Sequence, residues 1–170
     1  TTPASGSAQR EFTGVYNNDH FGYSVRIPDG LIGRNSPPPA PDNGFVLSFG
    51  DSSMDRLSAW AELRPFEDDL GSIRDEFVAF ARDEETPLML KNELRTELNG
   101  FPAIQLEFVD SLTDATHTSL RLFAFRLCGE NQTPILYVIA LDSGSTNDKR
   151  SLTHFESLKH SWKMTEKCDI

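Results

Sequence analysis

Apolar and polar residues alternate along much of this chain, which is the period of a strand with one face in water. Turn sequences such as Pro28-Asp29-Gly30 end these runs. Two other runs are apolar at both odd and even positions, that is, on both parities. This favours strands inside a sheet that is covered above and below. The alternating runs are residues 21–27, 45–49, 57–63, 88–98 and 101–109, and the runs apolar on both parities are 120–127 and 135–141.

Two segments have apolar residues at helical spacing. The first begins with a capping-box-like sequence at Ser72, carries Phe77 and Phe80 on one stripe, and stops before Pro87. We expect this stripe to face the core. The second covers residues 148–162 and has cations near its C-terminal end, where the helix dipole favours them. Because there is no βαβ rhythm, the order predicts an α+β fold, an antiparallel sheet flanked by helices.

The clearest hairpin joins residues 88–98 to the next run. A two-residue turn at Asn99-Gly100 would set Arg95 opposite Ile104, a charge against an apolar side chain. A three-residue loop that ends at Gly100, with this glycine at positive φ, instead pairs Leu94 with Ile104. We therefore predict the longer, bulged loop.

Composition limits the number of domains and the class of partner. With 170 residues, 38% hydrophobic and 25% charged, the chain is long enough for one domain with a sizeable core. We expect a flexible tail over residues 1–11 and a single α+β domain over 12–170. A net charge of -10 disfavours nucleic acid and anionic lipid, and favours a protein partner with a basic surface. No apolar run approaches the roughly 18 residues of a membrane span.

The N-terminal sequence TTPASGSAQR and the two cysteines bear on the compartment. A small, polar tail often follows a cleaved signal peptide or tethers a lipoprotein, although an artificial extension would look the same. We expect an extracytoplasmic protein: periplasmic, secreted or lipid-anchored. There Cys128 and Cys168 would form one disulfide, whereas in the cytosol they would be unrelated thiols. We favour the disulfide.

The sequence predicts no metal site and no cofactor. Helical ligand pairs need histidines three or four residues apart, and His154 and His160 are six apart. Acidic runs at 67–69 and 83–85 lack the oxygen spacing and the glycine of a calcium loop. We interpret them as solvated helix ends, with a surface for a basic partner as the alternative. The histidines are His20, His117, His154 and His160.

One motif is typical of an enzyme. The sequence FGDS at residues 49–52 resembles the first block of the SGNH (GDSL-type) hydrolases, in which a distant Asp-x-x-His activates the serine. Asp114 and His117 have that spacing. In the family, however, the pair lies near the C-terminus, and a helix stands where residues 57–63 predict a strand. We expect no catalytic residue and predict that Ser52 is not a nucleophile; a small serine hydrolase remains the alternative.

A second resemblance covers most of the chain. Its motifs are VRIP at residues 25–28, LNGFPA at 98–103 and FESLKHSW at 155–162, around two adjacent apolar strands. Together they resemble the Mog1/PsbP-like superfamily, which includes DcrB-type and LpqN-type bacterial lipoproteins. The resemblance implies an α/β/α sandwich with an accessory or binding role and no shared catalytic centre. An immunity protein or effector chaperone that binds another bacterial protein would share this fold. The proline-rich segment 35–44 and the cysteine pair have no match in the family.

Overall fold

The computed structural model describes residues 10–35, 42–49, 55–65, 69–83, 87–110, 118–144, 149–168 and 170. Its elements follow one another as strands, a helix, four strands, a second helix and a short last strand. They are β1 (Glu11–Phe12), β2 (Val15–Asn18), β3 (Tyr23–Arg26), β4 (Ile32–Asn35), β5 (Gly44–Ser48), β6 (Arg56–Leu63), α1 (Leu70–Asp83), β7 (Leu88–Leu98), β8 (Phe101–Asp110), β9 (Thr118–Cys128), β10 (Thr133–Ser143), α2 (Lys149–Ser161) and β11 (Lys163–Met164).

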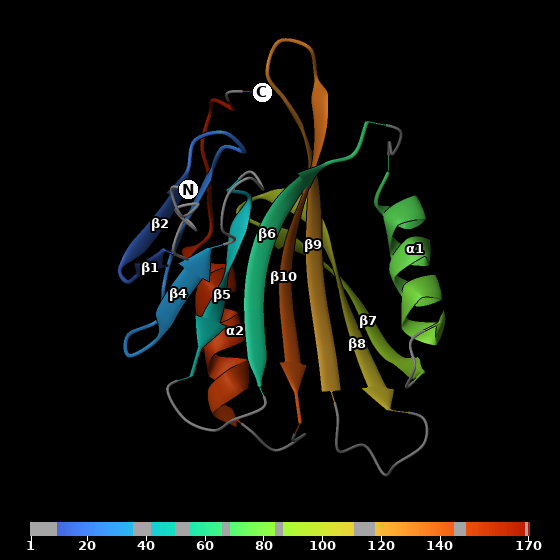
Figure 1. The fold of residues 1–170 in the computed structure, drawn as a ribbon. Helices are drawn as coiled ribbons and strands as arrows, with labels where there is room; N and C mark the ends of the chain where they lie inside the picture. Colours follow the sequence, from blue (N-terminus) through green and yellow to red (C-terminus); the bar gives the residue numbers. More distant parts are fainter. Residues whose placement is uncertain are drawn as a thin grey trace, which may run out of the picture.

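Eight strands form the main sheet in the order β1-β4-β5-β6-β10-β9-β8-β7. Every neighbouring pair is antiparallel. The two runs that are apolar on both parities became β9 and β10, which lie inside this sheet as predicted. A separate three-stranded sheet has the order β11-β3-β2. The predicted antiparallel sheet flanked by helices is therefore confirmed (Figure 1).

The back face of the main sheet, turned away from the viewer in Figure 1, packs against α2 and the three-stranded sheet. Among the described residues, 24 buried side chains form this back core. Trp162 stacks on Tyr23 with ring centroids 4.6 Å apart, and the Tyr137 hydroxyl donates a 2.6 Å hydrogen bond to the Phe21 carbonyl. Buried aromatic rings of this kind contribute much of a core's stability.

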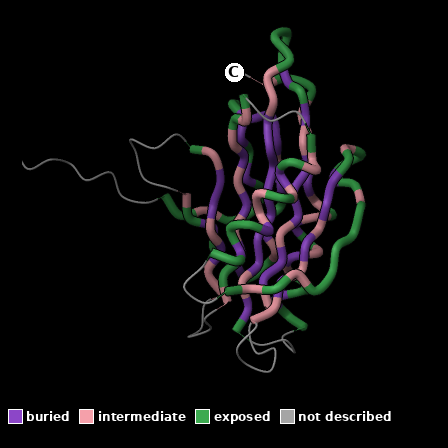
Figure 2. The backbone as a smooth tube through the Cα atoms, turned by 90° about the vertical axis from the view of Figure 1, so that its right-hand side faces the viewer, coloured by how far each residue is buried: buried purple, intermediate pink, exposed green. Residues whose placement is uncertain are grey.

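Of the described elements, only α1 packs on the front face, and it covers part of that face. α1 lies against β7 and β8, and the front core contains nine buried residues in the part of the chain that the structure describes. In Figure 1 the strands β4, β5, β6 and β10 face the viewer with no described helix over them. Figure 2 shows buried backbone along the central strands and exposed backbone at their ends.

The turn of the β7–β8 hairpin is shorter than predicted. Asn99 and Gly100 alone form it, with φ values of 50° and 83°, which are typical of the two-residue turn that Asn-Gly favours. Leu94 lies opposite Gln105 and not opposite Ile104. The predicted three-residue loop is wrong, whereas the predicted positive φ at Gly100 is confirmed.

A bulge in β7 explains this error. The prediction assumed that every second residue of β7 lies on the same face from end to end. The register instead shifts between Leu90 and Asn92, so the face changes there. Leu90 therefore packs on the front core, while Leu98 is buried in the back core. The observed turn sets Arg95 opposite Ile104, the pairing that the parity argument had rejected.

The helices agree with the prediction apart from the start of α1. The Ser72 amide donates a 2.8 Å hydrogen bond to Asp69 Oδ1, so Asp69 is the N-cap and the capping sequence begins three residues earlier than predicted. α2 agrees to within one residue at each end, which is the usual spread of helix boundaries. Of the expected N-terminal tail, residues 1–9 lie outside the described part, and Glu11 already belongs to β1.

Candidate functional site

A groove opens on the front face between α1 and the uncovered strands, and we call it the front groove. Its volume is about 240 Å³. Helix α1 supplies one wall, while β6 and β9 supply the sheet side. The lining residues are Trp60, Glu62, Arg64, Glu76, Phe77, Phe80, Ala81, Leu88, Phe108, Ser119 and Arg121.

Aromatic side chains give the front groove its apolar character. Phe77 stacks on Phe123 with ring centroids 4.9 Å apart, which fixes α1 against the sheet. Phe80, one turn further along α1, is 65% exposed. The prediction that the whole stripe of α1 faces the core is therefore wrong at Phe80. Trp60 packs against the front core and remains partly exposed at the groove.

An arginine shared by two carboxylates lies at the rim of the groove. Arg64 donates hydrogen bonds of 2.7 Å to both Glu62 Oε1 and Glu76 Oε2. Burial alone would lower the pKa of Arg64, but its bonds with Glu76 and Glu62 outweigh this and raise the pKa above its ordinary value. The guanidinium therefore stays charged and fixes β6 to α1.

A second arginine, Arg74 of α1, is also shared by two carboxylates. Arg74 lies 2.9 Å from Asp75 Oδ1 and 3.3 Å from Glu93 Oε2 of β7. These bonds, first to Asp75 and then to Glu93, raise the pKa of Arg74. Because each of the two arginines is shared by two carboxylates, the surface along α1 carries a net negative charge. This local charge agrees with the basic partner that the composition predicts.

A third ion pair lies on the sheet side. Arg121 of β9 lies 3.0 Å from Asp142 Oδ1 of β10, and the Ser119 hydroxyl donates to the same oxygen at 2.9 Å. The charged side chains named at the groove thus have partners within the fold. Such pre-formed pairs leave the exposed aromatic surface as the part that a ligand can cover.

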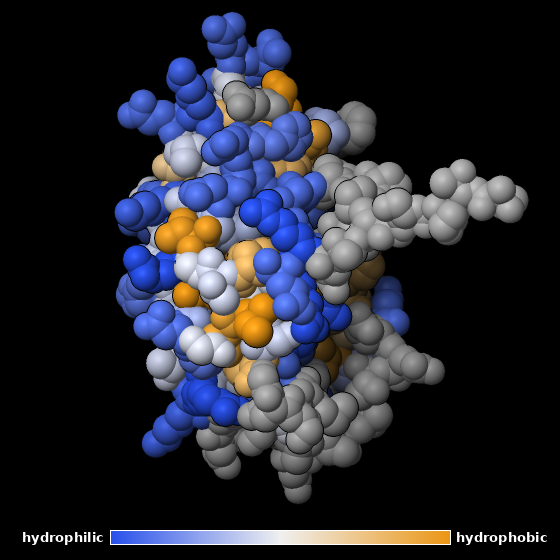
Figure 3. All heavy atoms as spheres, turned by 60° about the vertical axis from the view of Figure 1, so that its left-hand side comes forward, coloured by the Kyte–Doolittle hydropathy of each residue, from blue (hydrophilic) through white to orange (hydrophobic). Residues whose placement is uncertain are grey.

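The surface of the side that carries β1 and β4 differs from the front groove in how its hydrophobic side chains are distributed. Figure 3 shows that the hydrophobic side chains on this side form small areas among hydrophilic ones. Val15 and Ile32 are exposed there, at 50% and 40%. Scattered apolar side chains of this kind are normal on a protein surface.

The residues of the hydrolase hypothesis lie outside the described part. Ser52, Asp114 and His117 all fall in segments that the structure does not describe. Of the other histidines, His20 packs on Phe21, and His154 packs on Phe49, the first residue of the FGDS sequence. Within the described ranges, no three His, Cys, Asp or Glu side chains gather closely enough to hold a metal ion.

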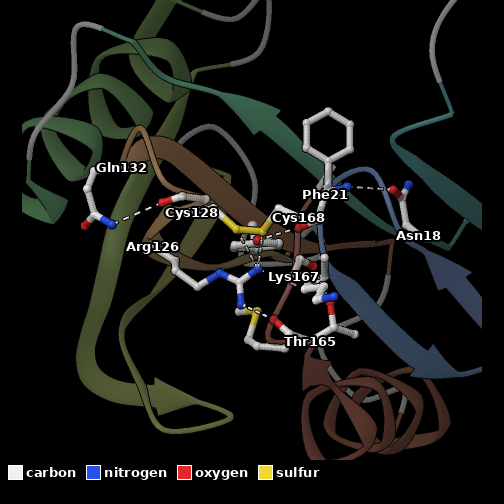
Figure 4. The surroundings of a disulfide bond; sticks show 12 residues. Asn18, Phe21, Arg126, Cys128, Gln132, Thr165, Lys167 and Cys168 are labelled. Carbon is white, nitrogen blue, oxygen red and sulfur yellow. Dashed lines mark hydrogen bonds between the residues drawn. A yellow bond between two sulfur atoms is a disulfide. The ribbon is translucent and has the colours of Figure 1, made fainter. Parts of the chain in front are cut away.

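Cys128 and Cys168 are joined by a disulfide, with Cα atoms 6.1 Å apart (Figure 4). The bond ties the segment after α2 to the end of β9, forty residues earlier in the chain. It lies on the back face, away from the front groove, because Cys128 belongs to the back core. No described helix combines the length and apolar character that a membrane crossing requires.

Comparison with known proteins establishes the fold. No protein-family model matches the chain, and no curated protein matches it in sequence. Cyanobacterial PsbP (CyanoP) from Synechocystis sp. PCC 6803 is similar in structure, with a TM-score of 0.62 and 14% identity over 96% of both chains. LpqN of Mycobacterium tuberculosis, which is involved in cell envelope biogenesis, has a TM-score of 0.62 and 13% identity over 92% of this chain and 91% of its own.

Both of these structures are Mog1/PsbP-like proteins, so the present chain has the Mog1/PsbP-like fold. At 13–14% identity the likeness concerns the arrangement of strands and helices. The sequence resemblance predicted this fold from three short motifs. It did not predict the front groove.

Proposed function

We propose that this protein is a non-catalytic, extracytoplasmic accessory domain that binds another protein through the front groove. The observation that carries the proposal is the partly covered front face, where Phe80 is exposed and Trp60 is partly exposed. Beside them, two carboxylates, those of Glu62 and Glu76, share a single arginine, Arg64. Exposed aromatic side chains with a polar rim are typical of protein docking surfaces.

The partner segment that suits the groove is basic and carries an apolar side chain. The apolar side chain would pack on Phe80 and Trp60, and its lysines or arginines would face the acidic surface along α1. The chain's net charge of -10 supports the same sign of partner. An immunity protein or effector chaperone would use the same contacts, so only the identity of the partner separates these roles.

Three observations support the extracytoplasmic location. A disulfide persists in oxidising compartments and is rare in the cytosol. The N-terminal residues have the composition of a segment that follows a signal peptide or tethers a lipoprotein. LpqN, a protein of similar fold, is involved in cell envelope biogenesis.

Trp60 provides a direct test of binding. Trp162 is 1% exposed, so replacing it by Phe leaves Trp60 as the only tryptophan and as a reporter at the groove. A lysine–leucine peptide should change Trp60 fluorescence saturably, and the same peptide with glutamate for lysine should not. Phe80→Asp should weaken binding at least about tenfold, the loss that 1.4 kcal/mol of contact energy produces.

A matched control is available on the other helix. Leu152 of α2 is 42% exposed and lies away from the front groove, so Leu152→Asp should leave the titration unchanged. Equal responses to both peptides, or a larger loss in Leu152→Asp than in Phe80→Asp, would contradict docking at the front groove.

The hydrolase alternative has its own experiment. We expect no labelling by a fluorophosphonate probe and no turnover of a short-chain p-nitrophenyl ester, because activation of Ser52 would need a base within about 3.2 Å and a third group to orient it. The matched variant is Ser52→Ala. Labelling or turnover that this substitution abolishes would replace the accessory role by a serine esterase.

A further inference from the structure

A buried arginine lies beside the disulfide. Arg126 is 8% exposed, and among the described residues its guanidinium contacts carbonyl oxygens and sulfur atoms, not a carboxylate. Its Nη1 donates a 2.7 Å hydrogen bond to the Thr165 carbonyl, its Nη2 donates to the Gly22 carbonyl at 3.2 Å, and its Nε has no partner. The rings of Phe101 and Tyr137 lie on it, each centroid 5.5 Å from the guanidinium carbon. Among the described residues, the positive charge therefore has no counter-ion in contact with it, and burial of an unpaired charge is costly in free energy.

The two sulfur atoms are the remaining neighbours of this charge. Arg126 Nη2 lies 2.7 Å from Cys168 Sγ and 3.2 Å from Cys128 Sγ (Figure 4). A neutral disulfide accepts such a hydrogen bond only weakly. A thiolate at either position would accept it as a charge-assisted bond and would neutralise the buried cation.

The local backbone is shaped for this contact. Gly22 has a φ of 67°, and a Cβ atom there would lie 2.5 Å from Arg126 Nη2 and 2.7 Å from Cys168 Sγ. Glycine thus allows the backbone of the β2–β3 turn to approach both the guanidinium and the sulfur.

We propose that Cys128–Cys168 is a redox-active disulfide that undergoes thiol–disulfide exchange with a dithiol partner, and that Arg126 stabilises the thiolate it releases. The inference is independent of the front groove. The Cys128–Cys168 bond differs from a purely structural disulfide, because the reduced form gains a hydrogen bond between Arg126 and a thiolate that the oxidised form lacks. This makes the disulfide easier to reduce.

The geometry indicates which sulfur is attacked. An open cavity of about 970 Å³ lies between the segment after α2 and the tip of the β9–β10 hairpin, and both cysteines line it. Cys128 is only 4% exposed, whereas Cys168 is partly exposed. A thiolate of the dithiol therefore attacks Cys168 Sγ, the disulfide breaks, and Cys128 leaves as a thiolate beside Arg126 Nη2.

The second half of the exchange completes the reaction. The remaining thiol of the partner loses its proton and attacks its own sulfur in the mixed disulfide. This releases the Cys168 thiolate and leaves the partner as a disulfide. Two electrons have moved from the dithiol to the protein. The dithiol has lost two protons, and the pH and the pKa of each cysteine decide whether the two new thiolates take them up.

The first test is a redox equilibrium of the whole chain in glutathione buffers, read from a maleimide gel shift. Arg126→Gln should shift the equilibrium toward the disulfide by about tenfold, the effect of one pKa unit of lost thiolate stabilisation. Arg126→Lys keeps the charge and should fall between the two. Arg34→Gln, which removes a distant exposed arginine paired with Glu11, should behave like the wild type. Equal equilibria in wild type and Arg126→Gln would overturn the proposal.

A second measurement needs no substitution at Arg126 and decides the matter if that variant does not fold. In the reduced wild-type protein, the rate of iodoacetamide alkylation should rise with a midpoint below the ordinary cysteine pKa of about 8.5. In reduced Cys168→Ser, the remaining thiol of Cys128 should keep this low midpoint. A midpoint at or above about 8.5 in both proteins would show that Arg126 does not stabilise a thiolate.

Discussion

The two faces of the main sheet differ in how completely they are covered. The back face lies under α2 and a second sheet, and its tryptophan, Trp162, is 1% exposed. Among the described elements, only α1 covers the front face, and Trp60 and Phe80 remain accessible beside it. A closed face stabilises the fold, whereas a half-open aromatic face is available for binding. We therefore expect substitutions on the back to change stability and substitutions on the front to change recognition.

The largest expected effect compares two phenylalanines on opposite faces. Phe155 of α2 is 0% exposed, so Phe155→Ala should lower the free energy of unfolding by about 3–5 kcal/mol through lost burial and a cavity. Phe80→Ala should change it by no more than about 0.5 kcal/mol, because the side chain is 65% exposed. Urea denaturation measures both values. Similar losses in the two variants would remove the distinction between the faces.

The disulfide should contribute the next largest amount to the back face. Removing it in Cys168→Ser should lower the free energy of unfolding by roughly 3 to 4 kcal/mol, since the crosslink closes a long loop in the unfolded chain. Urea denaturation of this variant and the oxidised wild type gives the difference. Thiol titration of unreduced, denatured wild-type protein is the accompanying control, and two free thiols would contradict the bond.

The hairpin turn should show a smaller effect. Gly100 has a φ of 83°, and a Cβ atom there would meet no other atom within 4 Å. Gly100→Ala should therefore cost about 1 kcal/mol from backbone strain alone. Thermal unfolding followed by circular dichroism suffices to measure it, and an unchanged transition would argue against the positive φ.

The tyrosines of the back face should respond to alkaline pH. Burial is the largest cause that raises the pKa of Tyr16, Tyr23 and Tyr137, and near Tyr137 the Arg126 charge opposes the shift. Their contribution to stability should be fully present below about pH 10, the unfolded pKa, and lost as the pH rises through the raised folded values. Ultraviolet titration should detect tyrosinate only as the protein unfolds. Ionisation of one tyrosine near pH 10 in folded protein would show that its ring is not buried.

Much of the fold could be predicted because alternation and helical spacing are local signals. The strands β9 and β10, apolar on both parities, revealed a sheet covered on both sides. The hairpin register could not be predicted, because the bulge between Leu90 and Asn92 reverses the parity that the argument used. A single residue inserted in a strand leaves no distinct mark in the pattern.

The front groove was missed for a related reason. Phe80 shares the apolar stripe of α1, and only the position of α1 at one side of the sheet leaves it exposed. Trp60 did give a signal, since it occupies a polar position in the alternating run 57–63. The buried charge of Arg126 is likewise a product of tertiary packing, which brings Gly22, Thr165 and the two cysteines around one side chain.

Backbone amide hydrogen exchange, with and without the lysine–leucine peptide, tests the functional difference between the two faces most directly. We predict slower exchange on peptide binding in β6 around Trp60 and in α1 around Phe80, and unchanged exchange in α2 around Leu152. Protection confined to α2 or to the tip of the β9–β10 hairpin would contradict docking on the half-open front face.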